Sequence, residues 1–337
     1  MKNNEHYIGV DVSKNSLDIY ALKGQEKLFY LRVSNDEKGF KVFAKECKKH
    51  GIIPKKTLLC LENTGVYGYL LALWAVKNAY NVWVENAISI KRSLGLVRGK
   101  NDKVDAHRIA LYAFRFEDKC KLWQPPRKAI LVLKQLLTAR KRLITAKQRL
   151  QTPLKEVVSF LSKKEQKEIE KSCKPALEGI KKSIKKIDEK IDEHIKKDTK
   201  ISRMVKIATS VDGIGPQIAI SFIVATNEFK NAKNGKQVAC YVGVIPFEHT
   251  SGTSVKGKSR VSHMANKPLK SIMHMGALSA IQHSEELGGY YQRKVKEGKP
   301  KMSAINAVKN KQILRMCACI RDDRMYEKTY TKNLEVS

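Results

Sequence analysis

Two short apolar runs in the first part of the chain each end in a carboxylate. The run YIGV (residues 7–10) is followed by Asp11, and the run LLCL (residues 58–61) is followed by Glu62. Short, continuous apolar runs are typical of buried β-strands. An acid within such a pattern has little structural use, most clearly at Asp11. The sequence therefore predicts a sheet with functional carboxylates at its strand ends.

Two further acids, Asp102 and Asp105, open the helical stretch DKVDAHRIALYAF (residues 102–114). Because they are three residues apart, they share one face of that helix. Two strand ends and one helix start can converge on one point, where four carboxylates would repel each other unless cations lay between them. Oxygen ligands favour Mg²⁺, with Mn²⁺ as the alternative. A pair of such ions, roughly 3.5–4 Å apart, can stabilise phosphoryl transfer. We therefore expect all four acids to be metal ligands and catalytic residues.

Each acid also has a structural interpretation. Asp102 could be a helix N-cap, with Asp105 at the third helical position completing an arrangement like a capping box. For this pair in isolation, the cap is the simpler interpretation. Glu62 could cap the helix expected over residues 65–76.

The chain carries a large excess of positive charge. Among 337 residues, 66 are Lys or Arg and 33 are Asp or Glu, which gives a net charge of +33. Most of this excess lies beyond residue 125. Such a balance predicts nucleic-acid binding with strong salt dependence. A general lysine bias with solvated helix faces would explain only part of it.

The seven cysteines include no C-x-x-C pair, which argues against a zinc ribbon. Their odd number and apolar neighbours favour reduced thiols in a cytoplasmic protein. The N-terminus does not resemble a signal peptide. The longest strongly apolar run, YLLALWAV, is too short to cross a bilayer, so we expect no membrane partner.

Residues 1–125 have an α/β pattern. Three strand-like runs come first, and a helix over residues 35–50, a strand, a helix and another strand follow. This is the layout of a ribonuclease-H-like domain. In that layout the first and fourth strands lie side by side, which would place Asp11 next to Glu62.

Residues 126–205 are predicted to form a helical middle segment. Pro125 and Pro126 interrupt the α/β pattern, and a long helix is expected over residues 127–150. A second helix carries aliphatic residues at alternating spacings of three and four, which indicate a heptad seam. We expect an antiparallel helical hairpin or a coiled coil between subunits. The seam residues are Leu177, Ile180, Ile184, Ile187, Ile191 and Ile195.

Residues 206–325 form a third, mostly helical part, followed by a tail over residues 326–337. Gly213-Ile214-Gly215 resembles a helix-hairpin-helix turn, whose N–H groups could bind a phosphate; an ordinary turn is the alternative. The polar stretch over residues 246–260 predicts a functional loop. Within it, Ser251 has basic neighbours and could attack phosphorus. From composition alone, however, a flexible loop that grips phosphate is the simpler interpretation. Its basic residues are Lys256, Lys258 and Arg260.

Several motifs together resemble transposases of the insertion-sequence one-ten family, also called DEDD recombinases, along nearly the whole chain. Their order and spacing make the resemblance specific. The motifs are GVDVSKNSLDIYAL, LENTGVYG, KNDKVDAHRIA, SVDGIGPQIA, YVGVIPFEHTSG and YYQRKVKEGKPKMSAINAVKNKQILRM.

The resemblance implies a RuvC-like nuclease domain, a coiled-coil segment and a C-terminal transposase domain. The family's acidic quartet falls on the four acids already identified, and its nucleophilic serine falls on Ser251. The implied activity is Mg²⁺-assisted cutting and rejoining of donor and target DNA through a serine–phosphate intermediate. The implied partners are a bridge RNA and further copies of the chain, in a homodimer or homotetramer in which another subunit's serine completes each site.

The chain departs from the family pattern after the serine. Residues 262–265 read Ser-His-Met-Ala where the family often has Ser-Lys-x-Gly, and Lys270 stands where an Arg is common. These departures affect a turn and a phosphate contact, and they leave the quartet and Ser251 unchanged. His249 and His263 could relay a proton, although a lone His is more often structural. His107 is expected either to support the site or to be structural.

Three other functions fit parts of this pattern. A site-specific DNA invertase would need no RNA. A RuvC-like metal-dependent endonuclease would use water in place of Ser251. A non-catalytic nucleic-acid scaffold would bind DNA without cutting it.

Overall fold

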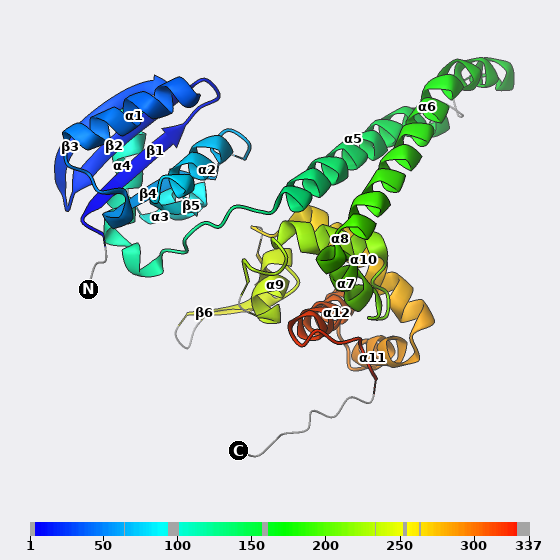
Figure 1. Cartoon of the computed structure of the whole chain (residues 1–337). Coiled ribbons are helices and arrows are strands. Elements are labelled where there is room, and N and C mark those ends of the chain that lie inside the picture. The colour runs from blue at the N-terminus through cyan, green and yellow to red at the C-terminus, as the bar shows by residue number, and fades with distance from the viewer. Residues whose placement is uncertain are drawn as a thin grey trace. The chain divides into compact units, whose positions relative to one another are not determined.

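A computed structural model of the chain describes residues 4–63, 65–93, 101–156, 161–232, 234–251, 255–262 and 264–328. Internal contacts group the chain into two compact units, Met1–Pro125 and Pro126–Ser337. The first unit is a mixed α/β structure, and the second is mostly helical (Figure 1). The expected separation of residues 126–205 from residues 206–325 stays a prediction.

The first unit contains a five-stranded sheet with the order β3-β2-β1-β4-β5. Strands β1, β2 and β3 form an antiparallel meander, whereas β4 runs parallel to both β1 and β5. The predicted pairing of the first and fourth strands is therefore confirmed. The strands are β1 (His6–Val12), β2 (Ser16–Lys23), β3 (Glu26–Ser34), β4 (Thr57–Glu62) and β5 (Asn81–Glu85).

Alternate residues of β1 contribute to the two cores of this unit. Ile8 and Val10 lie in the core that α1 and α2 cover, whereas Tyr7 lies in the core that α4 covers. Period-two alternation directs successive strand side chains to opposite faces. The sheet thus forms the middle layer between two helical layers. The helices are α1 (Glu37–Lys49), α2 (Tyr69–Lys77), α3 (Ala87–Ser93) and α4 (Asp102–Arg115), with short 3₁₀ turns η1 (Pro54–Lys56) and η2 (Glu117–Lys119).

Gly9 in β1 lets the backbone of α4 lie directly on the sheet. A Cβ atom at this position would be far inside van der Waals contact with Ala110 N and Ala106 O, and 2.8 Å from Ala110 Cα. Because only glycine lacks that atom, the close approach of helix and strand depends on it. The contact holds the first turn of α4 beside the carboxyl end of β1.

The second unit begins with two long helices that pack side by side in antiparallel directions (Figure 1). Ile130 and Leu133 near the start of α5 share a core with Ile191 and Ile195 near the end of α6. The earlier seam residues of α6 are only half-buried. No helix in the described ranges is both long enough and apolar enough to cross a membrane. The helices are α5 (Lys128–Glu156), α6 (Lys163–Lys197), α7 (Thr199–Thr209), α8 (Pro216–Ala225), α9 (Gly235–Val242), α10 (Lys267–His283), α11 (Glu285–Lys296) and α12 (Lys301–Arg321).

An ion network anchors the start of α5 to the following helices. Arg127 donates to Asp198 Oδ2 at 2.7 Å and to Glu228 Oε1 at 2.6 Å. The Glu228 side chain is fully buried, and the ammonium groups of Lys200 and Lys230 also face it. Burial would raise the pKa of Glu228, but the hydrogen bonds and positive charge of Arg127 outweigh it and leave the pKa below its ordinary value. The buried carboxylate is therefore charged and matched by cations.

We predict that Gly9→Ala destabilises the first unit by about 1–3 kcal/mol, because an added methyl group would push α4 away from β1. Urea unfolding followed by tryptophan fluorescence would measure this change. Gly179→Ala in α6 is the control. A Cβ atom there meets nothing within 4 Å, and Gly179 belongs to the second unit, so this variant should leave the unfolding of the first unit unchanged. Equal stability of Gly9→Ala and the unmodified protein would contradict the close packing.

Candidate functional site

Asp11 and Glu62 lie at the carboxyl ends of two neighbouring parallel strands. Val10 pairs with Leu61 in the β1–β4 ladder, so each acid is the next residue along its strand. Helix α4 packs on both strands and starts at Asp102, and its first turn also contains Asp105. The fold therefore brings the predicted quartet to one end of the sheet.

The suggested capping roles of these acids are wrong. The N-cap of α4 is Asn101, whose side chain accepts a hydrogen bond from Val104 N at 2.9 Å. Asp102 is the first helical residue and Asp105 the fourth. Helix α2 starts at Tyr69 after Gly68 and has no side-chain cap, so Glu62 does not cap it. Helix capping thus does not explain why these acids are present.

The four carboxylates are close enough to affect each other electrostatically. The pKa of Asp11 is raised to about 6, first by burial and then by the negative charges of Asp105, Glu62 and Asp102. Like charges raise a carboxyl pKa because they disfavour its ionised form. A cation at this position would relieve the repulsion, and the all-oxygen donor set suits a hard divalent ion.

Arginines pair with two members of the quartet. Arg108 Nη1 lies 2.9 Å from Asp105 Oδ1, and Arg32 Nη1 lies 3.4 Å from Asp102 Oδ2. No group of three or more His, Cys, Asp or Glu within the described ranges is placed to hold a metal ion. The carboxylates would therefore have to move closer together before they could share one cation. The donor chemistry fits a divalent cation, but the ligands are not gathered around one point.

A fifth carboxylate, Asp18, was missed in the sequence. It is only 2% exposed and pairs with Asp11 across the β1–β2 ladder. Tyr30 donates its hydroxyl to Asp18 at 2.5 Å, and Arg32 Nε lies 3.8 Å from it. The signal that singled out Asp11, an acid within a strand-like pattern, also applies to Asp18. Arg32 therefore connects a buried carboxylate with the exposed Asp102 of the quartet.

His107 occupies a structural position on α4. Its ring centroid lies 4.5 Å from that of Tyr20. Burial and the charge of Arg108 lower the pKa of His107, so a neutral ring is favoured. The contact is consistent with a supporting role.

Ser251 is the last residue of β6 (Pro246–Ser251), which pairs with β7 (Val255–Val261). The predicted loop over residues 246–260 is therefore wrong for most of its length, because a two-stranded hairpin forms there. Residues 252–254 and His263 lie outside the described ranges, and His249 belongs to β6. The predicted cations Lys256, Lys258 and Arg260 occupy alternate positions of β7. Their contacts with nucleic acid stay predictions.

Packing explains Gly213. Its φ is +77°, and a Cβ atom there would lie 2.6 Å from Gln312 Nε2 and 2.7 Å from Ala280 Cβ. Gln312 also donates to the Asp212 carbonyl at 2.8 Å. Gly215 is the N-cap of α8, and a Cβ atom there meets nothing within 4 Å. A phosphate contact at Gly215 stays a prediction.

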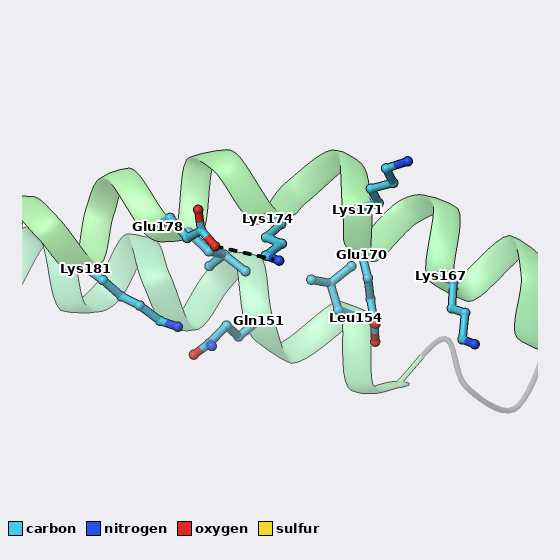
Figure 2. A pocket seen from close by; sticks show the side chains of 9 residues that line it. Gln151, Leu154, Lys167, Glu170, Lys171, Lys174, Glu178 and Lys181 are labelled. Carbon is cyan, nitrogen blue, oxygen red and sulfur yellow. Dashed lines mark ion pairs between the residues drawn. The ribbon is translucent and has the colours of Figure 1, made fainter.

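A surface groove of about 620 Å³ lies between the C-terminal part of α5 and the N-terminal part of α6 (Figure 2). Lys167, Lys171, Lys174 and Lys181 contribute to its lining. Lys174 pairs with Glu178 at 3.9 Å. Its described lining residues include no Ser, Thr, Cys or His, so we interpret the groove as a basic surface of the hairpin rather than a reaction site.

Comparison with known proteins supplies independent information. A family model of DEDD transposases of the IS110 type matches residues 8–162, and a model described as the transposase IS116/IS110/IS902 family matches residues 205–292. The chain is 26% identical over 326 residues to the pilin gene-inverting protein of Moraxella bovis, across 96% of this chain and 98% of that protein. The protein of the same name from Moraxella lacunata has the same identity and coverage. A shorter match, 25% over 131 residues, covers 39% of this chain and 32% of an uncharacterized insertion element IS110 protein of Streptomyces coelicolor.

We predict that Asp11→Asn stabilises the metal-free protein at about pH 7, and that the gain disappears toward about pH 4. The raised pKa means that the folded protein binds the Asp11 proton more tightly than the unfolded chain does. The unmodified, metal-free protein therefore loses stability as the pH rises through about 6. Mg²⁺ should restore stability to the unmodified protein but not to Asp11→Asn. Urea unfolding midpoints at both pH values, with and without Mg²⁺, would measure these effects.

Asp36→Asn is the control for this experiment. A hydrogen bond from Gly39 N lowers the pKa of Asp36. The Asp36→Asn variant should therefore be less stable than the unmodified protein at neutral pH. The same pH response in both variants would contradict the assigned environment of Asp11.

Proposed function

Because the chain belongs to the IS116/IS110/IS902 family of transposases, a family of DNA recombinases, we propose that it cuts and rejoins the DNA of an insertion sequence through a serine–phosphate intermediate. The observation that carries the proposal is the placement of Asp11, Glu62 and the first turn of α4 at one end of the sheet. We propose a ribonuclease-H-like, RuvC-like fold for the first unit. The antiparallel meander followed by parallel strands supports it.

In the proposed reaction, the Ser251 hydroxyl attacks phosphorus and forms a new P–O bond. The bond to the 3′ oxygen breaks, which leaves a protein–DNA phosphoester and a free 3′ hydroxyl. The covalent link conserves the energy of the broken bond, so a 3′ hydroxyl of the new partner can displace the serine without ATP. One acid of the quartet could accept the serine proton.

The quartet of Asp11, Glu62, Asp102 and Asp105 would hold Mg²⁺, or Mn²⁺ in its place. When bound, the ion would polarise the scissile phosphate and neutralise developing charge. Arg32 and Arg108 hold the two helical acids.

We propose that the basic residues of β7 hold DNA by its backbone. Phosphate contacts position a protein on nucleic acid, whereas base contacts supply specificity. No element with an evident base-reading set was identified in the sequence. We therefore propose that a bridge RNA pairs with donor and target DNA and supplies specificity. The α5–α6 pair would form the coiled coil of a homodimer or homotetramer in which another subunit's serine completes each site.

We predict that Ser251→Ala abolishes the covalent protein–DNA adduct while DNA binding persists. The adduct should fall about 10³-fold or more, because no other group replaces the attacking oxygen. Asp11→Asn should also abolish it. Denaturing gels of reactions with labelled DNA would measure the adduct, and anisotropy would measure binding.

Ser262→Ala is the matched control. Its hydroxyl accepts a local hydrogen bond from Met264 N at 3.1 Å, so its loss should leave the adduct intact. Mg²⁺-dependent cutting by Ser251→Ala, with no adduct in the unmodified protein, would favour the endonuclease instead.

A site-specific DNA invertase is the second candidate function. The Moraxella relatives, whose printed name is pilin gene-inverting protein, match over nearly the full chain, and this observation favours inversion. The same chemistry would exchange strands at two sites within one DNA molecule.

We predict that a defined RNA copurifies with the protein from cells that carry the DNA flanking its gene. Ribonuclease treatment should then abolish recombination, because base pairing would supply the specificity. Sequencing of the extracted RNA, with a strand-exchange assay before and after treatment, would test this. Full recombination after ribonuclease digestion would favour an invertase that reads its own sites.

A further inference from the structure

The chain exposes three large apolar side chains where it passes from β4 into α2, shortly after Glu62. Val66, Tyr67 and Leu70 are 65%, 43% and 57% exposed. We call these three side chains the apolar patch. A single exposed apolar residue needs no explanation, whereas several together mark a binding surface. The patch therefore calls for a partner.

Hydrogen bonds from Asn35 hold this turn beside the strand end that carries Asp11. The side-chain amide of Asn35 donates to the Ser13 carbonyl at 2.9 Å and to the Tyr67 carbonyl at 3.1 Å. Ser13 is two residues beyond Asp11, so their Cα atoms lie at most about 7 Å apart. The backbone N–H of Asn35 also donates to the Asn15 carbonyl at 3.0 Å. One residue thus ties the loop after β1 to the turn after β4.

Packing on both sides fixes the backbone of this turn. The Oδ1 atom of Asn35 is buried and has no hydrogen-bond partner among the described residues. Turning the amide over would place this oxygen against two carbonyl oxygens, so only one orientation of Asn35 is favourable. At the start of α2, the ring of Tyr69 meets Trp123 edge-on, with centroids 5.8 Å apart. The turn is therefore held in place while the apolar patch stays exposed.

The position of the patch favours nucleic acid as its partner over a second copy of the chain. The acidic quartet lies at the same end of the sheet, where the proposed reaction takes place at a phosphate. Stacked nucleotides follow each other at about 3.4 Å along a strand, so the neighbours of that phosphate reach the distance of the turn. Bases have flat apolar faces that stack on aromatic side chains. The patch offers such an aromatic ring at Tyr67.

We propose that the apolar patch binds an unpaired base of the DNA strand whose phosphate lies at the acidic site. Tyr67 stacks on the base, and Val66 and Leu70 exclude water around it. The base is unpaired because bases in an intact duplex stack on each other, and strand exchange separates them. The inference rests on the proposed function in that it places DNA at the acidic end of the sheet.

The test measures binding of the full chain to two fluorescein-labelled DNA single strands of equal length by anisotropy, one with thymine bases and one abasic. Tyr67→Ala should weaken binding to the thymine strand about tenfold, the loss of one stacked base. It should leave the abasic strand unaffected, because that strand has the same phosphates but no base. The slope of log affinity against log salt, from about 50 to 200 mM, should also stay unchanged, because stacking releases no counterions.

Two control variants separate stacking from other effects. Tyr67→Phe keeps the ring and should bind the thymine strand as the unmodified protein does. Ile53→Ala removes a side chain that is 47% exposed and precedes β4, at the opposite end of this strand from Glu62, so it should change neither affinity. Equal losses of Tyr67→Ala on both strands, a changed salt slope, or unchanged binding to the thymine strand would overturn the proposal. A smaller oligomer in light scattering, with unchanged DNA binding, would identify a second copy as the partner instead.

Asn35→Ala tests the anchoring of the turn. It should weaken binding to the thymine strand and not to the abasic strand, because the released turn no longer holds the ring in place. The double variant with Tyr67→Ala should bind little more weakly than Tyr67→Ala alone. Strictly additive losses, in variants that thermal unfolding shows to be folded, would overturn the role of Asn35. Adduct formation at Ser251 is not part of these readouts, so the base contact and the proposed reaction can fail separately.

Discussion

The contact between the α4 backbone and β1 at Gly9 is the constraint on which the acidic site depends. Sheet pairing alone places Asp11 beside Glu62, because both follow paired residues of parallel strands. Asp105 joins them only because α4 lies directly on the sheet, and a Cβ atom at Gly9 would prevent this. The absence of a side chain at Gly9 thus allows the acids of α4 to lie close to Asp11 and Glu62.

Charge balance distinguishes structural from functional groups in both units. The buried Glu228 is matched by cations and secures the start of α5. In contrast, burial and the charges of its acidic neighbours raise the pKa of Asp11. This imbalance costs folding free energy that a bound cation would recover.

Local patterns in the sequence predicted much of the first unit. The apolar runs before Asp11 and Glu62 became paired strands, and the meander and its crossover followed from the order of the elements. Sequence patterns gave wrong predictions where two structural interpretations of the same residues had similar support. Asn101 rather than Asp102 caps α4. The polar stretch around Ser251 forms a hairpin, because its backbone groups pair across β6 and β7 despite a composition typical of loops.

Apolar periodicity and acids at strand ends are properties of neighbouring residues, so the sequence by itself determined the α/β pattern, the helical remainder and the candidate quartet. Which charges meet depends instead on contacts between residues far apart in the chain. The pairing of Arg32 with Asp102 and the place of Asp18 opposite Asp11 emerged only in the folded molecule. The reason is physical: electrostatic energy depends on distance and burial in space, and neither quantity is encoded in the spacing of residues along a strand or helix.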